Sequence, residues 1–451
     1  MNHDARAWAE GHRQFFEERL RTLVELPTVS AQPDRGPVME RCAEEAVALI
    51  RHFGGTAEIW RSGGKPYVHG VFGAADRPSV VIYNHLDVQP ADEPEWKGEP
   101  FRMRVDGDRY LGRGTTDDKG PALTCLLSVA HAVRRGVPLR FDLLWELEEE
   151  IGSPGFAAML AEHAPELGRV RAILVSDSLW VSAERPSMDV GLRGFLALTL
   201  KLRTADVDAH SGVVGGGGPN AVAELVRVLA ACYDASTGRI LVPGVLDEVV
   251  HATDAELDAY LRSGFEVETF RKTYGFRWLL TTEPRDLLRR LWTEPTWEVH
   301  GIVGGYQGPG IKSIVPAHAE AKVSLRLVPR QSPAKVGEAI RAFVKQLNPH
   351  VEVTVLNGAP AFVTSLDSPE CKAMNRAVDR VLGKTLAVTR GGGSIPAVAT
   401  MAEVLKAPVL LMGLSLPEHG YHAPNEFFDW RQARRGVEIY GAWFDALVGQ
   451  G

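Results

Sequence analysis

The sequence has few cysteines, no long apolar run and no excess of basic residues. Its 451 residues include only Cys42, Cys125, Cys232 and Cys371, whose spacing fits neither a disulfide framework nor a thiolate zinc site. We therefore expect a reducing, cytoplasmic location. No run of about 18 apolar residues predicts a membrane span, and the charged segment 1–26 predicts an amphipathic helix rather than a signal peptide.

The charge and the length narrow the class of protein further. Lys and Arg number 50 against 57 Asp and Glu, a net charge of −7, so no overall basic surface is available for nucleic acid. Small substrates are the expected partners, and neither nucleic acid nor a membrane is. A chain of this length with 45% hydrophobic residues can bury a large core in about two or three domains.

Three short apolar segments, 79–83, 140–145 and 172–175, predict strands that are buried on both faces of a sheet. Helical patterns occupy 119–135 and 156–163 between them. This alternation of strands and helices favours an α/β sheet. Ligands of such sheets bind beyond the carboxyl ends of the strands, which is where the segments NHLD, ELEEE and SDS fall.

A different pattern begins near residue 190. In residues 195–202, Leu alternates with Ala, Thr and Lys, which indicates a sheet that is exposed on one face. The elements predicted after it are helices at 220–233 and 333–347 and strands at 299–303, 321–328 and 351–356. Together they fit a small α+β layer.

The first pattern returns toward the end of the chain. Residues 396–405 predict a helix, and residues 409–412 predict a strand that leads into PEHGYH. We therefore predict a catalytic domain in two parts, 1–190 and 366–451, interrupted by a second domain at 191–365.

Acidic and histidine residues follow the predicted strands. In His85-Leu-Asp87 the alternate side chains point to the same side, so an imidazole and a carboxylate can touch, and the carboxylate would fix the histidine tautomer. A plain turn at the end of a strand explains the same residues. Asp117 and Asp118 precede a predicted helix, where a carboxylate can cap the helix or bridge two cations.

The other acidic and histidine residues point to the same chemistry. Glu148, Glu149 and Glu150 repel one another unless a cation is near, although acidic loops without a metal exist. Asp177 could cap the turn after its strand, and His422 lies in a short cluster of histidine and glutamate. Taken together, carboxylates and imidazoles without cysteine suit a catalytic Zn²⁺ or Mn²⁺ site. Two such ions, about 3.5 to 4 Å apart, can clamp an attacking water and a substrate oxygen, so we predict a hydrolase.

A series of motifs extends over nearly the whole chain. They are NHLDVQP (84–90), GRGTTDDKGP (112–121), ELEEEIGSPG (146–155), VSDS (175–178), GLRG (191–194), DAHSGVVGG (208–216), KSIVP (312–316), SLRLVP (324–329), GGGSIP (391–396) and HGYHAPNE (419–426). In these motifs the chain resembles the dinuclear zinc metallopeptidase family of aminoacylases, glutamate carboxypeptidases, succinyl-diaminopimelate desuccinylase and carnosine-type cytosolic dipeptidases. The resemblance implies a zinc-exopeptidase-like catalytic domain with a mixed, largely parallel sheet and an inserted, ferredoxin-like lid domain that dimerises.

The resemblance also implies roles for the matching residues around two metal ions, zinc first and manganese or cobalt as alternatives. The implied ligands are His85 and Asp177 for one ion, Glu150 and His422 for the other, and Asp117 as the bridge. Asp87 would orient His85, and Glu149 would be the general base that takes a proton from the attacking water and passes it to the leaving amine. The family's cis peptide bond would lie between Asp117 and Asp118.

Further roles follow for the inserted domain and the substrate. His210 would reach the active site of the other subunit and stabilise the oxyanion, although by itself it reads as a turn residue. Arg326 would grip the terminal carboxylate of the substrate through its forked guanidinium, although by itself it reads as a solvated strand residue. The substrate contacts implied near that carboxylate are Ser313, Gly392, Gly393 and Ser394.

The motifs look more like the dipeptidase branch of the family than the aminoacylase or desuccinylase branches. The segment TSLDSPE (364–370) lacks the histidines that carnosine-type dipeptidases have there, which counts against carnosine as the substrate. We predict a homodimeric, metal-dependent dipeptidase or short-peptide exopeptidase that cuts near a free C-terminal carboxylate. The alternatives are an N-acyl amino acid amidohydrolase and a non-catalytic binding protein on the same scaffold, and the intact Glu149 argues against the binding protein.

Overall fold

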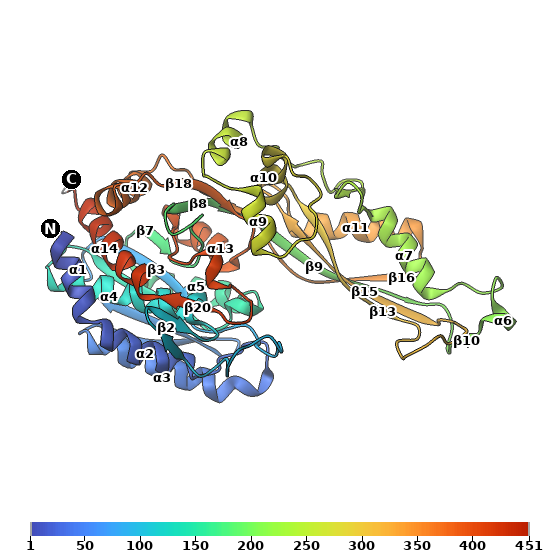
Figure 1. The fold of residues 1–451 in the computed structure, drawn as a ribbon, viewed down its shortest axis with the longest axis horizontal. Helices are drawn as coiled ribbons and strands as arrows, with labels where there is room; N and C mark the ends of the chain where they lie inside the picture. The colour runs from blue at the N-terminus through green and yellow to red at the C-terminus, as the bar shows by residue number, and fades with distance from the viewer. Residues whose placement is uncertain (1, 450–451) are drawn as a thin grey trace.

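The computed structural model describes residues 2–449, and a nine-stranded sheet lies inside its larger lobe, on the left in Figure 1. Across the sheet the strands are β1 (Thr56–Ser62), β2 (Lys65–Phe72), β6 (Arg140–Glu146), β3 (Ser79–His85), β7 (Val170–Val175), β19 (Val409–Leu411), β8 (Ser187–Leu192) and β17 (Phe362–Val363), with β18 (Ala387–Gly391) paired to β8. β6, β3, β7 and β19 run parallel, and antiparallel pairs flank them on both sides. Every residue of β3 and β6 is buried, which confirms the prediction of doubly buried strands.

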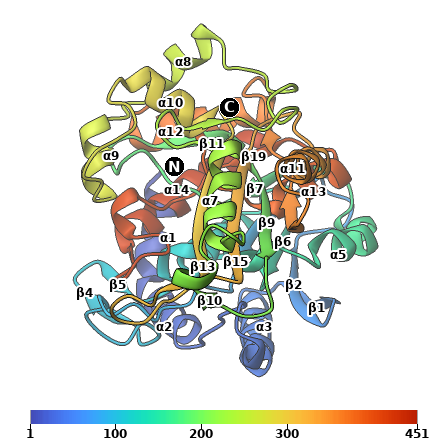
Figure 2. The same ribbon diagram turned by 90° about the vertical axis from the view of Figure 1, so that its right-hand side faces the viewer.

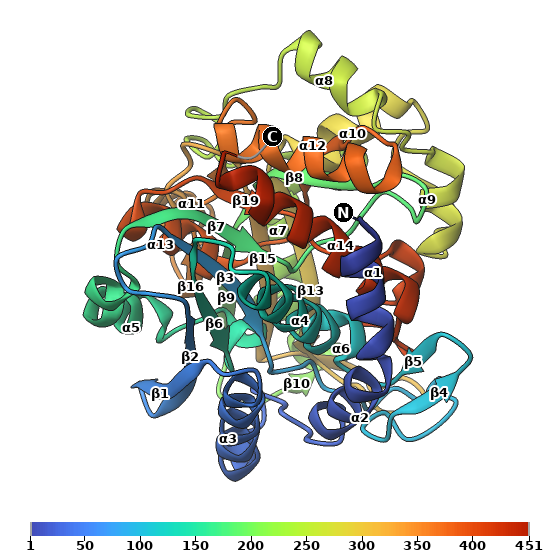
Figure 3. The same cartoon turned by 90° about the vertical axis from the view of Figure 1, so that its left-hand side faces the viewer.

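Helices cover both faces of this sheet, because successive strand residues point to opposite sides. Val80 and Ile82 pack in one core and Val81 and Tyr83 in another. The helices of the first core are α1 (Asn2–Gly11), α2 (Arg13–Val24), α3 (Gly36–His52), α4 (Gly120–Arg134), α12 (Pro369–Leu382) and α14 (Trp430–Leu447), most of them in front in Figure 3. The helices of the second core are α5 (Phe156–His163) and α13 (Pro396–Leu405), both with the predicted bounds.

A smaller antiparallel sheet extends away from the large one (Figure 1), and we call residues 194–359 the projecting region. Its strands, in order, are β13 (Thr296–Gly304), β15 (His318–Leu327), β9 (Gly194–Arg203) and β16 (Val351–Ala359). The alternating leucines of β9 face a core formed with α7 (Ala221–Cys232) and α11 (Pro333–Leu347). Figure 2 shows α7 lying over these strands. The prediction of a half-exposed sheet is confirmed.

The far end of the projecting region is a small antiparallel pair, β10 (Ala209–His210) with β14 (Ile314–Val315), followed by the one-turn helix α6 (Ser211–Val214). The near end carries β11 (Tyr233–Asp234), β12 (Arg239–Ile240) and three helices that the sequence did not predict: α8 (Asp254–Leu261), α9 (Val267–Thr273) and α10 (Pro284–Trp292). Leu257 and Leu288 of these helices pack on Val190 of β8.

The two parts of the chain that flank the projecting region meet in a three-stranded sheet of β4 (Arg104–Asp106), β5 (Arg109–Leu111) and β20 (Phe427–Asp429). The single helix predicted at the start of the chain is wrong, because the structure has two helices there, α1 and α2, separated at His12. The domain boundaries predicted at residues 190 and 365 stay a prediction. No helix within residues 2–449 combines the length and the apolar character that a membrane span requires.

Candidate active site

The predicted ligands gather at the carboxyl edge of the large sheet. His85 is the last residue of β3, Asp177 lies just beyond β7, and the three glutamates lie just beyond β6. Parallel strands end at the same edge of a sheet, so side chains from neighbouring strands reach a common volume. The turn that precedes α4 and the loop around His422 bring the remaining predicted ligands to the same place.

Asp117 lies between the two predicted histidine ligands. His85 Nε2 is 2.9 Å from Asp117 Oδ1, and His422 Nε2 is 3.0 Å from Asp117 Oδ2. His422 Nε2 is also 3.3 Å from Glu150 Oε2. A carboxylate with one imidazole on each oxygen has the arrangement that a bridging ligand needs. The peptide bond between Asp117 and Asp118 is cis, as the resemblance implied.

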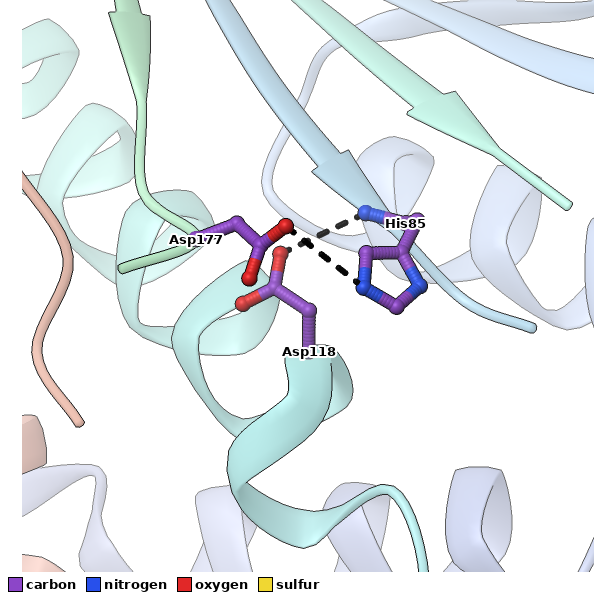
Figure 4. A group of neighbouring side chains, drawn as sticks. All are labelled: His85, Asp118 and Asp177. Carbon is purple, nitrogen blue, oxygen red and sulfur yellow. Dashed lines mark hydrogen bonds and ion pairs between the residues drawn. The ribbon is translucent and has the colours of Figure 1, made fainter. Parts of the chain in front are cut away.

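The donor atoms form two groups. One group is Asp117, Glu150 and His422, the other is His85, Asp118 and Asp177, and within each group the atoms lie within 4.8 Å of one another. Figure 4 shows the second group, in which His85 Nε2 is 3.8 Å from Asp177 Oδ2. Asp118 was not among the predicted ligands. Its Oδ2 accepts hydrogen bonds from Asn84 Nδ2 (2.7 Å) and the backbone N–H of His85 (3.3 Å), whereas its buried Oδ1 has no hydrogen-bond partner within residues 2–449.

These donors fit two divalent cations. Carboxylate oxygens and imidazole nitrogens without thiolates suit Zn²⁺, Mn²⁺ or Co²⁺. Burial raises the pKa of Asp177 to about 7, and the neighbouring carboxylates of Asp117 and Glu150 act in the same direction. Burial lowers the pKa of His422, but hydrogen bonds with Asp117 and Glu150 outweigh burial and raise this pKa to about 11. The carboxylates therefore stabilise positive charge beside them, which a divalent cation in each group would supply when bound.

Asp87 contacts both His85 and the loop of the predicted base. The backbone oxygen of Asp87 lies 3.1 Å from His85 Nδ1, and its carboxylate Oδ1 lies 3.5 Å from the same nitrogen. The carboxylate also accepts hydrogen bonds from two backbone N–H groups, that of Glu149 on Oδ1 (3.1 Å) and that of Glu150 on Oδ2 (3.0 Å). One carboxylate thus contacts a predicted metal ligand and the chain segment that carries Glu149 and Glu150.

Glu148 received no role from the sequence, and the structure supplies a contact for it. Its Oε1 accepts hydrogen bonds from the Tyr67 hydroxyl and from the backbone N–H of Gly155 (2.6 Å). The side chain therefore closes the turn that follows β6 and belongs to neither donor group. The three consecutive glutamates have different surroundings: Glu148 holds the turn, Glu149 lies on the segment held by Asp87, and Glu150 faces His422.

Two further side chains contact the predicted ligands. Gln89 Nε2 donates a hydrogen bond to Glu150 Oε2 (2.7 Å), and the Tyr421 hydroxyl donates one to Asp177 Oδ1 (3.2 Å). Such outer contacts fix the orientation of a ligand. Sequence reasoning missed both residues, although they lie inside the motifs NHLDVQP and HGYHAPNE, because neither residue type marks a metal site by itself.

Arg326 and the glycine turn meet at the near end of the projecting region. Arg326 Nη1 donates a hydrogen bond to Ser394 Oγ (2.9 Å). Arg193, which sequence reasoning missed, donates from Nε to the Gly392 oxygen (3.0 Å) and from its backbone N–H to the Gly393 oxygen (3.1 Å). Burial and the nearby Arg326 lower the pKa of Arg193 to about 10. Two cations held close together on a turn form a suitable place for a carboxylate.

The strand β10 lies at the opposite end of the projecting region (Figure 1) and ends at His210, and Ser313 directly precedes β14, its partner strand. The backbone N–H of Ser211 donates a hydrogen bond to the Ser313 oxygen (3.0 Å), and His210 Nδ1 accepts one from the backbone N–H of Gly212 (2.9 Å). Between this end and Arg326 runs the length of β15, roughly 26 Å at the rise of an extended strand. Within one chain these two residues therefore join neither the ligand cluster nor the carboxylate turn.

Comparison with known proteins places the chain in a family. Residues 81–446 match the model of peptidase family M20/M25/M40. The Cys-Gly metallodipeptidase dug1 of Schizosaccharomyces pombe is 30% identical over 455 aligned residues, which cover 96% of this chain and 95% of that protein. This chain belongs to peptidase family M20/M25/M40. The resemblance predicted from the motifs is confirmed, and so is the prediction of a metallopeptidase.

A human sequence and a human crystal structure are also similar to this M20-family chain. The Beta-Ala-His dipeptidase is 31% identical over 384 residues, which cover 81% of this chain and 74% of that protein. The crystal structure of human carnosine dipeptidase 1 superposes with a TM-score of 0.88 at 26% identity and covers 99% of each chain. The predicted α/β fold is therefore confirmed for the whole described chain.

Proposed function

We propose that this M20-family chain is a dinuclear, metal-dependent dipeptidase that hydrolyses an amide bond close to a free C-terminal carboxylate. The observation that carries the proposal is the position of Asp117, whose two oxygens lie 2.9 and 3.0 Å from the imidazoles of His85 and His422. The relatives support a dipeptide as the substrate, because they are a Cys-Gly metallodipeptidase and a Beta-Ala-His dipeptidase.

The proposed chemistry divides the site between metal ligands and a base. Two divalent cations held by His85, Asp177, Asp117, Glu150 and His422 would polarise the substrate carbonyl and acidify the attacking water. Glu149 takes a proton from that water on a carboxylate oxygen and later gives it to the nitrogen of the leaving amine. Burial raises the pKa of Glu149, which suits a group that must accept a proton and release it again. Asp87 keeps the base in place through the backbone N–H of Glu149.

The carboxylate end of the substrate is proposed to bind at the glycine turn. Arg326 would hold one carboxylate oxygen in a charge-assisted hydrogen bond, and Ser394 fixes the direction of its guanidinium. Gly393 leaves open space beside the turn, whereas Gly392 lies against the Arg193 guanidinium, and Arg193 holds the backbone oxygens of both glycines. A substrate that lacks a free carboxylate leaves these cations without a partner, so exopeptidase specificity follows.

We propose a homodimer in which His210 of the partner subunit completes the site. The far end of the projecting region exposes apolar side chains that a partner would cover, since Val213 is 81%, Ile311 97% and Val303 58% exposed. Ser313 is hydrogen-bonded beside His210, so its proposed substrate contact also belongs to the partner's site. His210 would donate a hydrogen bond to the oxyanion of the tetrahedral intermediate.

Zinc is the metal that we propose, with manganese and cobalt as alternatives that the same donors accept. The location proposed is cytoplasmic, and the four cysteines, all unpaired and buried, are compatible with a reducing compartment. The boundaries proposed for the two parts of the catalytic domain and for the inserted domain are 1–190, 366–451 and 191–365.

The test is a hydrolysis screen of the protein loaded with Zn²⁺ or Mn²⁺. Cys-Gly, β-Ala-His and dipeptides of common amino acids are assayed beside N-acetyl and N-succinyl amino acids. We expect dipeptides to have the higher kcat/KM, and we expect a chelator to abolish turnover until metal is restored. Faster hydrolysis of N-acyl amino acids would replace the proposal with an amidohydrolase, and turnover that survives removal of the metal would end it.

A further inference from the structure

A buried ion pair lies behind the ligand cluster. Arg113 Nη1 donates a hydrogen bond to Glu426 Oε2 (2.9 Å), although the two residues are 313 positions apart. Their exposed fractions are only 1% and 0%. Transfer of an ion pair out of water is costly and seldom adds net stability. A pair in this position therefore calls for a reason other than stability.

Glu426 holds the turn that carries Asp117. Its Oε2 accepts a hydrogen bond from the backbone N–H of Gly114 (3.0 Å), and its Oε1 accepts from those of Thr116 (2.9 Å) and Asp117 (3.2 Å). Three backbone N–H groups within four residues donate to one carboxylate, which leaves the turn little freedom. The Asp117 carboxylate is thereby fixed between the two histidines.

Arg113 connects that turn to two other loops. It donates from Nη2 to the backbone oxygen of Pro90 (3.1 Å) and from Nη1 to that of Ala423 (3.4 Å). Pro90 follows Gln89, whose amide contacts Glu150. Ala423 follows His422, a member of the same donor group. The guanidinium therefore contacts the loop of Gln89, whose amide binds Glu150, and the loop of His422.

We infer that Arg113 and Glu426 are the positioning pair of the Asp117, Glu150 and His422 group, and that the affinity of this group for a divalent cation depends on them. Neither side chain contacts the cation. They act by holding three loops in one arrangement, so that the ligand oxygens and the imidazole are in place before the cation binds. The inference rests on the proposed function only in that it takes this group as a metal site.

The test compares Glu426→Gln with a matched buried carboxylate. Asp142→Asn is the control, because Asp142 is 0% exposed and pairs with Arg140 at 2.7 Å. Asp142 lies near the start of β6, and the ligand cluster lies beyond the other end of that strand. The Zn²⁺ dissociation constants and the bound stoichiometry are measured by competition with a chelator and by native mass spectrometry. Because Asp117 is proposed to contact both ions, we expect Glu426→Gln to weaken the binding of both: about tenfold to hundredfold for the ion at Asp117, Glu150 and His422, as the loss of outer contacts does elsewhere, and less for the other ion. The affinities of Asp142→Asn should equal those of the unchanged protein.

Three results would overturn the inference. They are unchanged affinity for both ions in Glu426→Gln, equal loss of affinity in Glu426→Gln and Asp142→Asn, and loss of affinity by the same factor for the two ions. If Glu426→Gln does not fold, Arg113→Lys decides the question, because lysine keeps the charge but cannot reach Glu426, Pro90 and Ala423 together. Unchanged affinity in Arg113→Lys would then overturn it. A protein that binds two ions but cleaves no dipeptide would refute the proposed function and leave the positioning pair intact.

Discussion

The carboxylate of Asp87 accepts a hydrogen bond from the backbone N–H of Glu149 at 3.1 Å. The same carboxylate accepts the N–H of Glu150, and the Asp87 backbone oxygen lies 3.1 Å from His85 Nδ1. A change at Asp87 therefore acts on a predicted ligand of each donor group and on the predicted base together. Asp87 itself belongs to neither donor group.

Asp87→Asn should lower both metal affinity and kcat. The amide offers one oxygen where the carboxylate offers two, so one of the N–H donors of Glu149 and Glu150 loses its acceptor, at a cost of about 1 to 3 kcal/mol. We expect metal affinity to fall about tenfold or more, as measured by chelator competition and steady-state kinetics. Asp92→Asn, at an exposed carboxylate in the following loop, is the control. Normal metal affinity in Asp87→Asn would contradict the role given to it.

Glu149→Gln should abolish most turnover without loss of metal. The amide cannot accept the proton of the attacking water, and general base catalysis contributes about 100-fold to 10,000-fold in rate. We expect kcat to fall within that range while metal content, measured by elemental mass spectrometry, stays unchanged. Glu44→Gln, at an exposed site on α3, controls for the amide itself. Unchanged turnover in the fully loaded Glu149→Gln protein would refute the base.

Arg326→Gln should act through the carboxylate of the substrate. Loss of a hydrogen bond to a charged group costs about 1.5 to 3 kcal/mol, or roughly tenfold to hundredfold in kcat/KM. We expect that loss with a dipeptide and little further loss with the corresponding dipeptide amide, because the two changes remove the same interaction. Arg41→Gln, on the exposed face of α3, is the control. Equal losses with both substrates would mean that Arg326 does not bind the carboxylate.

Helices and strands with a clear local sequence pattern were predicted correctly. The helices α11 and α13 begin at Pro333 and Pro396 and have the predicted bounds, because proline at the first helical position marks the start. The buried strands β3 and β6 were also predicted, because each is a largely apolar run. The predicted ligands lie at or just beyond their carboxyl ends. The helices α8, α9 and α10 were not predicted, because each is at most 9 residues long and buries few side chains.

Contacts between distant loops could not be predicted in the same way. Glu426 and Asp117 are 309 positions apart, and Arg193 and Gly392 are 199 apart, so no local periodicity relates them. The pair Asp117-Asp118 shows the same limit. The sequence indicated that carboxylates precede a helix, but only the folded turn directs one toward His422 and the other toward Asp177.

The proposed exchange of His210 between subunits can be tested by mixing two inactive variants. His210→Ala should be nearly inactive because the oxyanion loses its donor, and Glu149→Gln lacks the base. After subunit exchange, half of the dimers are mixed, and each mixed dimer has one site with both residues intact. Activity should then recover to about a quarter of that of the unchanged protein if the dimer is symmetric.

The mixing experiment separates action across the dimer from action within one chain. If His210 served its own subunit, every site in the mixture would lack one residue, and no activity would return. Two copies of the same variant, mixed in the same way, control for the exchange procedure. Fully active His210→Ala protein, or a monomer in light scattering under assay conditions, would also contradict the proposal. Recovery is the expected result, because His210 is exposed at the far end of the projecting region, away from the ligand cluster of its own chain.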